Sequence, residues 1–256
     1  MNMLRGLWFI AISLVLAAMI FQFMATAPAT AKERAAFVIG NAQYLDGTSR
    51  PQSVADAAAV ADMLRKIGFE VSERANLDRS AMKSAAEQFM STLGDTRIVV
   101  LFYSGGAMQV QGRSYLLPVD ASLSATTDLG SWATDLNSLL GPLSAMDRTV
   151  LAFLDIDRDN PLNLAPPPAR PPEPSSSTML IMYSAGPGQT VLVGPDRSSP
   201  FAAALLKHLP TPGLDLANVT QLIRADVVAA TNRRQIPWDH NAGVSQLILV
   251  PVDRKP

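Results

Sequence analysis

The stretch RIVVLFYSGG, residues 97–106, is a nearly continuous apolar run that ends in two glycines. Strands of this composition are covered on both faces, as in a parallel sheet flanked by helices. Because segments with helical spacing separate it from similar runs, the sequence predicts an α/β sandwich whose central sheet is mainly parallel. The other expected strands are residues 35–41, 69–77, 148–156, 177–185 and 244–250.

Five segments carry apolar residues at helical spacing, and several have recognisable end signals. Ser53 is expected to cap the first of these helices, and Gly68 to end it. Asp78 is expected to cap the second. Residues 108–120, MQVQGRSYLLPVD, predict a β-hairpin that turns near residues 111–112. The helical segments are residues 53–68, 78–94, 135–146, 199–209 and 216–232.

The composition excludes several kinds of site. The 256 residues suit one domain, and the formal net charge is −1 with basic residues scattered along the chain. No basic face therefore indicates nucleic acid as a partner. The chain has no cysteine, which rules out disulfides, thiolate metal ligands and a cysteine nucleophile. With only two histidines, a multi-histidine metal site is not expected either, and the sequence implies no metal or cofactor.

The N-terminal residues have the features of an export signal. Arg5 precedes an apolar run at residues 7–24, and a small-residue cleavage sequence, ATA, follows at residues 29–31. The run has about 18 residues, which is also near the lower limit for a membrane-spanning helix. We therefore expect residues 1–31 to be a cleaved signal peptide, with a retained single-span membrane anchor as the alternative. In both cases the domain at residues 32–256 is expected outside the cytoplasm, either secreted or periplasmic.

An acid-rich loop, LDIDRDNP at residues 154–161, follows one of the predicted central strands. Its aspartates fit the first, third and fifth positions of a calcium loop, but the glycine and glutamate required at positions six and twelve are absent. A catalytic pair of carboxylates is also less favoured than structural ion pairs, which are common. Ligands of open parallel sheets bind at the carboxyl ends of the strands. We therefore expect a crevice between this loop and YSGGA, residues 103–107.

No nucleophile, base and orienting residue can be assembled into a convincing set. Ser104 lacks the glycine two positions earlier that a nucleophile elbow requires. His208 lies near the end of a predicted helix, where a capping or surface role is expected. His240 lies in a predicted loop and is the less implausible base. Trp132 and Trp238 are expected to be packing residues.

The ordered series of segments resembles the caspase-like fold, and specifically the bacterial metacaspase-like (orthocaspase) group. The matching segments run in the same order through nearly all of residues 33–250. They are FVIGNAQY, VADAAAVADMLRKIGFEV, NLDRSAM, VVLFYSGGAMQVQGRSYLLPVDA, LAFLDIDRDNPL, SSPFAAALLKHL and VVAATNRRQIPWDH. The resemblance implies a caspase-like three-layer α/β/α sandwich with a mainly parallel central sheet and a small β-hairpin.

The resemblance also implies that both halves of the family's catalytic dyad are missing. Family members carry a histidine base where this chain has Gly106, and a cysteine nucleophile where it has Asp157. A carboxylate is a poor nucleophile toward an amide and repels the developing oxyanion. Loss of either group typically costs about a millionfold in a hydrolase that uses both. Asp157 is instead expected to pair with Arg158, Arg233 or Arg234 and fill the vacated site.

The binding side of the cleft is less altered. In metacaspase-like relatives, a basic side chain is held by acids near the positions of Asp56 and Asp155, with a serine at the position of Ser104. Two carboxylates on the floor of a cleft suit lysine or arginine. Alternatively, Asp56 is only a first-turn helix acid and Asp155 a cap of loop amides. The first hypothesis is a pseudoenzyme that binds or scaffolds, with a basic peptide or a caspase-like protease as partner.

Two other functions stay open from the sequence. One is a hydrolase that works through aspartates, through serine, or through residues that a partner supplies. The other is a structural protein of the cell envelope that inherited the fold. The proline-rich residues 165–174 are expected to form an exposed loop that acts as a stiff linker.

Overall fold

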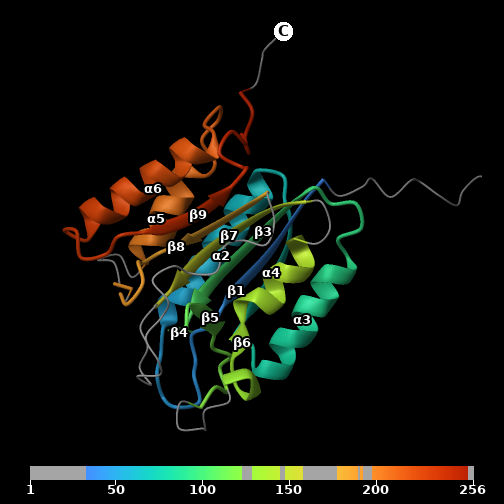
Figure 1. Ribbon diagram of the computed structural model, residues 1–256, viewed down its shortest axis with the longest axis vertical. Coiled ribbons are helices and arrows are strands. Elements are labelled where there is room, and N and C mark those ends of the chain that lie inside the picture. Colours follow the sequence, from blue (N-terminus) through green and yellow to red (C-terminus); the bar gives the residue numbers. More distant parts are fainter. Residues whose placement is uncertain are drawn as a thin grey trace, which may run out of the picture. The chain divides into compact units, whose positions relative to one another are not determined.

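The computed structural model describes residues 33–122, 129–144, 148–157, 178–189, 191–192 and 198–252. Its central sheet has six strands in the order β2-β1-β3-β7-β8-β9 (Figure 1). All neighbouring pairs run parallel except β8 and β9, which are antiparallel. The mainly parallel sheet predicted from the sequence is therefore confirmed. The strands are β1 (Arg34–Gly40), β2 (Glu70–Ala75), β3 (Ile98–Gly105), β7 (Thr149–Ile156), β8 (Met179–Tyr183) and β9 (Trp238–Ala242).

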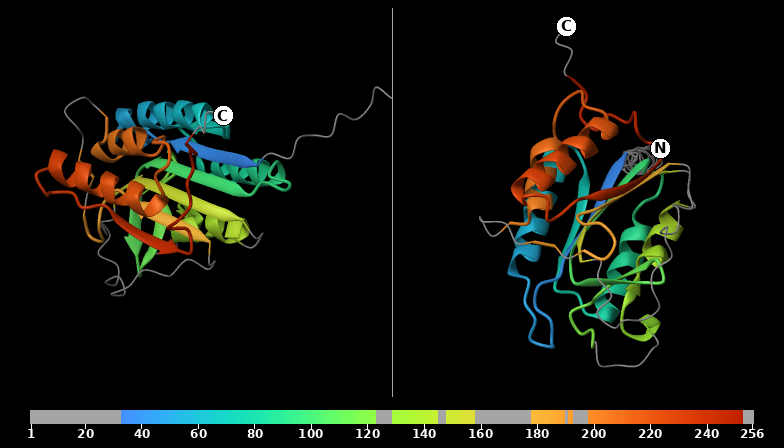
Figure 2. Two further views of the ribbon diagram at one scale, coloured as in Figure 1. Left: turned by 90° about the horizontal axis from the view of Figure 1, so that it is seen from above. Right: turned by 60° about the vertical axis from the view of Figure 1, so that its left-hand side comes forward.

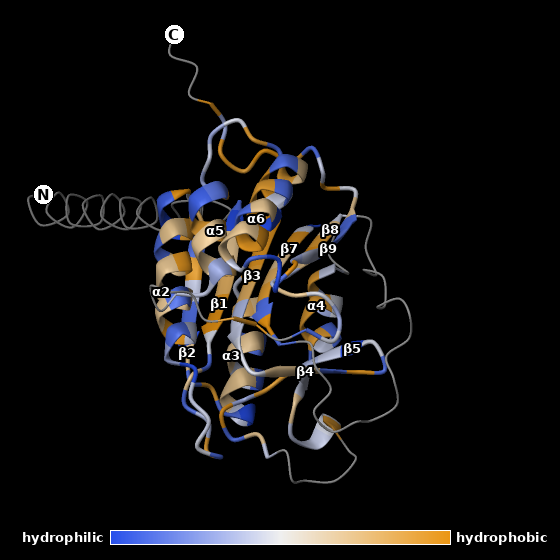
Figure 3. Ribbon diagram, turned by 90° about the vertical axis from the view of Figure 1, so that its left-hand side faces the viewer, coloured by the Kyte–Doolittle hydropathy of each residue, from blue (hydrophilic) through white to orange (hydrophobic). Residues whose placement is uncertain are grey.

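Helices cover both faces of this sheet, which gives the expected three-layer sandwich (Figure 2). Successive residues of β3 point to opposite layers: Leu101 and Tyr103 lie in one apolar core, and Val100 and Phe102 in the other. The central strands are accordingly apolar along most of their length (Figure 3). The first core is closed by α3 (Arg79–Ser91) and α4 (Leu136–Ser144). The second is closed by α2 (Pro51–Lys66), α5 (Pro200–His208) and α6 (Leu216–Ala230).

The predicted hairpin is present beside the main sheet. It consists of β4 (Ala107–Val110) and β5 (Arg113–Leu116), which pair antiparallel. At its turn, Gln111 and Gly112 have φ values of 50° and 76°, the left-handed conformation that a two-residue type I′ turn requires. A short strand, β6 (Thr134–Asp135), adds to β5 and makes a second sheet of three strands. The 3-10 helix η1 (Leu129–Ser131) precedes β6.

The ends of two helices test the capping predictions. Asp78 caps α3 as expected, because its carboxylate accepts a hydrogen bond of 2.7 Å from the Ala81 N–H. The prediction that Ser53 caps α2 is wrong. The helix begins earlier, at Pro51, whose fixed φ suits the first helical position, and no side chain caps it. Gly68 follows the helix with a φ of 89°, in agreement with the predicted end.

The last expected strand, residues 244–250, is not a strand. Its apolar residues pack onto the second core, and its backbone bonds to the start of α6, with Leu216 N–H donating to the Leu247 carbonyl at 2.9 Å. The edge position beside β8 is occupied instead by β9, residues 238–242. β9 was expected to be a loop because WDHNA is polar. An edge strand tolerates that composition, since only part of it is buried.

The predicted leader at residues 1–31 and the predicted loop at residues 165–174 lie outside the described residues. Among the residues that the structure describes, no helix is both long and apolar enough to cross a membrane.

Candidate functional site

The carboxyl ends of β3 and β7 bring the predicted site residues side by side. These strands are parallel neighbours, and Ser104 lies directly opposite Asp155 in their register. Gly106 follows β3 and Asp157 follows β7 at the same end of the sheet. Ser104 and Asp155 are only 2% and 4% exposed. The expected position at the carboxyl ends of parallel strands is therefore confirmed for these residues.

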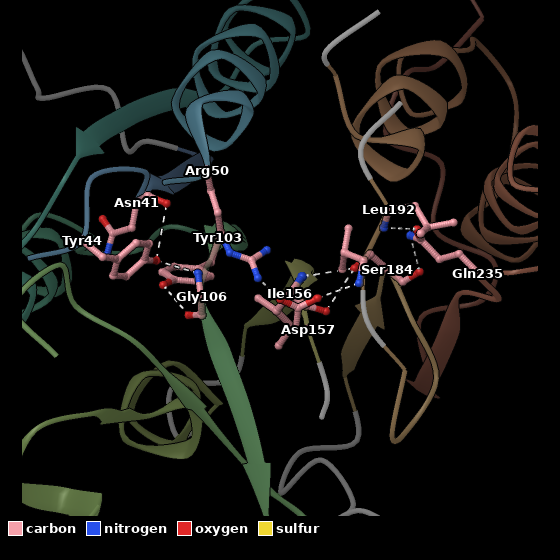
Figure 4. Close-up of polar contacts among 11 residues, drawn as sticks. Asn41, Tyr44, Arg50, Tyr103, Gly106, Ile156, Asp157, Ser184, Leu192 and Gln235 are labelled. Atoms are coloured by element: carbon pink, nitrogen blue, oxygen red, sulfur yellow. Dashed lines mark hydrogen bonds and ion pairs between the residues drawn. The ribbon is translucent and has the colours of Figure 1, made fainter. Parts of the chain in front are cut away.

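Asp157 is held from two sides (Figure 4). One carboxylate oxygen forms an ion pair with the guanidinium of Arg50, the residue before α2. The other accepts a hydrogen bond of 2.6 Å from the Val191 N–H. Asp157 is 7% exposed, so this pair is largely shielded from water. The carboxylate thus joins the start of α2 to the segment after β8.

Two of the three predicted partners of Asp157, Arg233 and Arg234, are wrong. Arg233 and Arg234 are exposed in the turn after α6, and Arg158 lies outside the described residues. The helix end sets the positions of the two arginines: Arg233 N–H donates to the Val228 carbonyl at 2.8 Å, which closes the last turn of α6. Sequence reasoning missed Arg50. The available signal was an arginine at the end of the loop that follows the first parallel strand, directly before a proline-started helix.

Gly106 lies against two tyrosines, as Figure 4 shows. Its N–H donates to the Tyr44 hydroxyl at 2.5 Å, and its carbonyl accepts from the Tyr103 hydroxyl at 2.9 Å. Burial raises the pKa of Tyr44, and it raises that of Tyr103 well above the usual range. Both rings therefore stay neutral and keep their hydrogen bonds. A Cβ at position 106 would lie 3.1 Å from the Tyr44 hydroxyl and 3.3 Å from the Leu117 side chain, so Tyr44 lies where a larger residue would extend.

Asp56 projects from α2 and holds the beginning of α5. Its carboxylate accepts from the Ser198 hydroxyl and, at 2.9 Å, from the Ser199 N–H. Ser199 in turn caps α5 through the Ala202 N–H. Asp56 is 2% exposed, and burial raises its pKa against the lowering effect of these hydrogen bonds. The alternative expectation, that Asp56 is only an acid in the first turn of a helix, is therefore wrong.

Asp155 is the least satisfied carboxylate of the site. Its Oδ1 atom is buried and has no hydrogen-bond partner among the residues that the structure describes. Burial raises its pKa to about 6, and the nearby Asp56 carboxylate adds to the rise. Hydrogen bonds from Ser199 and Ser184 and the charge of Arg50 oppose it. Burial and the neighbouring negative charge both make the ionised form of Asp155 unfavourable, and a bound cation or a proton would remove this cost.

The three predicted binding residues are thus close together, though the sequence did not indicate what links them. The Ser199 N–H donates to the Asp56 carboxylate, and the Ser199 side chain is also among the groups that lower the pKa of Asp155. Ser104 pairs with Asp155 across the strands. Nothing in the sequence near residues 198–199 distinguished these serines from others in the chain.

A buried glutamine fixes the segment that contacts Asp157. Gln235 is fully buried; its side-chain oxygen accepts from Leu192 N–H and its amide nitrogen donates to the Ser184 carbonyl, both at 2.9 Å. The Ser184 hydroxyl in turn accepts from the Ile156 N–H at 3.1 Å. Figure 4 shows this chain of bonds. It connects β7, β8 and the turn after α6, and it was not expected from the sequence.

Comparison with known proteins decides the family. A caspase domain model matches residues 33–247. The chain belongs to the caspase family. Over 91 residues it is 29% identical to human mucosa-associated lymphoid tissue lymphoma translocation protein 1 and to its mouse homolog, and the match covers 36% of this chain. It spans only 11% of those relatives. The fold is similar to the crystal structure of caspase-1 from Spodoptera frugiperda, with a TM-score of 0.66, 15% identity, and coverage of 88% of this chain and 93% of that one.

Within this caspase-family domain, Gly106 and Asp157 stand at the two positions that the resemblance assigns to the base and the nucleophile, and both are engaged in other contacts. Gly106 provides no proton acceptor, and its backbone is bonded to tyrosines. Asp157 offers a carboxylate that already binds a guanidinium and a backbone N–H. The arrangement supports ion pairing and hydrogen bonding, and neither position offers a side chain suited to attack an amide.

The two histidines lie in other surroundings than expected. His208 is largely buried, and its Nε2 lies 2.7 Å from a carboxylate oxygen of Asp226 on α6. His240 lies on the edge strand β9, not in a loop, and its ring contacts Trp238 edge-on with centroids 4.6 Å apart. Trp132 and Trp238 pack against apolar cores as predicted. Across the described parts of the chain, no group of three or more ligating side chains is arranged to hold a metal ion.

Proposed function

We propose that this caspase-family domain is a pseudoenzyme that binds a lysine or arginine side chain of a peptide without cleaving it. The observation that carries the proposal is Asp155, a buried carboxylate whose Oδ1 has no partner in the described part of the chain, beside the second carboxylate of Asp56. A guanidinium or ammonium group satisfies both at once through charge-assisted hydrogen bonds. Ser104 lies opposite Asp155 and adds a hydroxyl to the same place.

The lack of cleavage follows from the chemistry of two positions. The whole chain has no cysteine, so no thiolate is available anywhere. The Asp157 carboxylate is occupied by Arg50 and by the Val191 N–H, and a carboxylate attacks amides poorly. We also propose that the domain lies outside the cytoplasm, which the predicted export signal at residues 1–31 supports. A basic segment of a secreted or envelope protein, or of a caspase-like protease, is the partner class that this site suits.

The full-length protein is expected to show no turnover of fluorogenic peptides that end in arginine or lysine, with or without calcium. The reason is that a single missing nucleophile or base already lowers such a rate by about a millionfold. Turnover that disappears in the Asp157→Ala variant would contradict the proposal, since it would make this carboxylate catalytic. Turnover that survives Asp157→Ala but is lost after purification by a second route comes from a contaminating protease, whereas turnover that survives both would contradict the proposal, since the chain would then cleave through other residues.

Binding is tested separately, by calorimetric titration with an arginine-ending peptide amide. We expect measurable affinity that falls at least about tenfold in Asp155→Asn, because that change removes the buried charge but keeps the shape. Asp95→Asn is the matched control, since Asp95 is exposed in the turn after α3. A glutamate-ending peptide of the same length is not expected to bind. Equal affinities for the two peptides, or an unchanged affinity in Asp155→Asn, would remove the basic-pocket assignment.

A further inference from the structure

Arg50 is a cation beside the carboxylate site that the proposed function does not use. It stands directly before α2, and its side chain reaches the end of β7, where it meets Asp157 (Figure 4). Within the described part of the chain, Asp157 is the one partner of this guanidinium, which it contacts through Nη2. An arginine carries five N–H donors in a planar fork. Arg50 can therefore bind a second carboxylate while it keeps the first.

The two members of this ion pair differ in how far solvent reaches them. The Arg50 side chain is 30% exposed, whereas that of Asp157 is 10% exposed. Both oxygens of Asp157 are engaged, one by Arg50 and the other by the Val191 N–H. The carboxylate thus has no oxygen left for a ligand, while the arginine keeps both donors and access. Arg50 is the member of the pair that an incoming group can contact.

The distance between Arg50 and the basic pocket suits a particular ligand. Asp155 and Asp157 are two residues apart where β7 ends, which is about 6.6 Å along an extended backbone. In a single arginine residue with an extended side chain, about 7 Å separate the guanidinium from the main-chain carboxyl group. A guanidinium that binds Asp155 therefore places the carboxyl group of the same residue near position 157, where the Arg50 guanidinium lies.

The charges distinguish a terminal basic residue from an internal one. The charge of Arg50 already acts on Asp155, whose pKa it lowers. An internal arginine or lysine of a peptide would bring a second cation close to Arg50 and offer it only a neutral carbonyl. A C-terminal one brings its own carboxylate, which offsets the repulsion and accepts hydrogen bonds about twice as strong as those to a neutral group.

We propose that the site selects peptides that end in a free arginine or lysine carboxylate, with Arg50 binding that carboxylate while Asp155 and Asp56 hold the basic side chain. This rests on the proposed function, because the basic side chain must occupy the pocket at Asp155. Such ends form when the peptide bond after a basic residue is hydrolysed: water adds its hydroxyl to the carbonyl carbon, and the leaving amine takes up a proton. The reaction that supplies the ligand is thus cleavage after arginine or lysine by another protein.

The test is calorimetric titration of the full-length protein at neutral pH with two arginine-ending peptides, one a free acid and the other the amide of the same sequence. We expect the acid to bind about tenfold more tightly than the amide. This ratio is expected to fall to about one in Arg50→Met. It is expected to rise in Asp157→Asn, because Arg50 then has no competing carboxylate. Arg65→Met, which removes an exposed arginine near the other end of α2, is the control and leaves the ratio unchanged.

The amide reports in each variant whether the basic pocket is intact, so a folding defect is recognised by a loss of amide affinity. Should Arg50→Met not fold, its combination with Asp157→Asn removes the unpaired buried charge, and its ratio is also expected to be about one. Equal affinities of the unsubstituted protein for acid and amide overturn the inference and leave the proposed function standing. A ratio that Arg50→Met does not change, or that falls in Asp157→Asn as well, also overturns it. Absence of binding by both peptides removes the proposed function and this inference together.

Discussion

Replacing Arg50 with methionine is expected to lower the free energy of unfolding by about 2–4 kcal/mol, because Asp157 is left as a buried carboxylate without its cation. Asp157 is 7% exposed, and its remaining partner is the Val191 N–H at 2.6 Å. One hydrogen bond does not replace the attraction of a guanidinium in a shielded place. The Arg50 side chain is 30% exposed, which keeps the expected loss near the lower end of the range for buried pairs.

A double-mutant cycle measured by chemical denaturation of the full-length protein separates the pair from its parts. Asp157→Asn alone is expected to cost less, because the amide oxygen still accepts from Val191. Arg50→Met combined with Asp157→Asn is expected to recover about 1–3 kcal/mol relative to the sum of the single changes. Arg113→Met is the control. It removes an ion pair with Asp135 whose arginine is 53% exposed, so less than about 1 kcal/mol is expected. A loss in Arg50→Met no larger than in Arg113→Met would show that the pair contributes nothing to stability.

The parts of the fold that the sequence predicts are those decided locally. The apolar run at residues 97–106 became the central strand β3, because a strand buried on both faces has no polar positions. Asp78 and the residues 111–112 carry their own end and turn chemistry, so a short window sufficed. The same reliance on local composition missed the strand at residues 238–242. Its composition is polar because it is an edge, and only its pairing with β8 makes it a strand.

For the site, too, the sequence predicted some residues and missed others. Gly106, Asp157 and the trio of Asp56, Ser104 and Asp155 were named from the order of the segments. Their partners were not, because each comes from a distant part of the chain. Arg50 lies 107 residues from Asp157, and Ser198 lies 142 residues from Asp56. The partner of a buried charge is fixed by tertiary packing, to which sequence spacing gives no access.

The folded protein is expected to become more stable as the pH falls from about 7 to about 4, through Asp155. Its pKa is raised by burial from 3.8 to about 6, so the folded state takes up a proton that the unfolded chain still lacks in this range. For an acid whose pKa is raised on folding, stability is lost as the pH rises through the folded value. The shift of the Asp155 pKa can change the free energy of unfolding by at most about 3 kcal/mol. The measure is the difference in unfolding free energy between the natural chain and Asp155→Asn at each pH. A difference that does not change with pH would contradict the burial of an ionised group here.

Affinity for a basic peptide is expected to change in the opposite direction over the same range. The ionised form of Asp155 binds the cation, and the arginine of the ligand stays protonated throughout. As the pH falls below about 6, the affinity for an arginine-ending peptide amide therefore falls, by up to about tenfold for each pH unit. Asp56, whose pKa is also raised by burial, extends the same trend. In Asp155→Asn the remaining binding is expected to depend less on pH. If stability and affinity change in opposite directions with pH, and Asp155→Asn reduces both pH dependences, then the proton and the ligand bind the same carboxylate. Slopes of the same sign would separate them and remove Asp155 from the binding site.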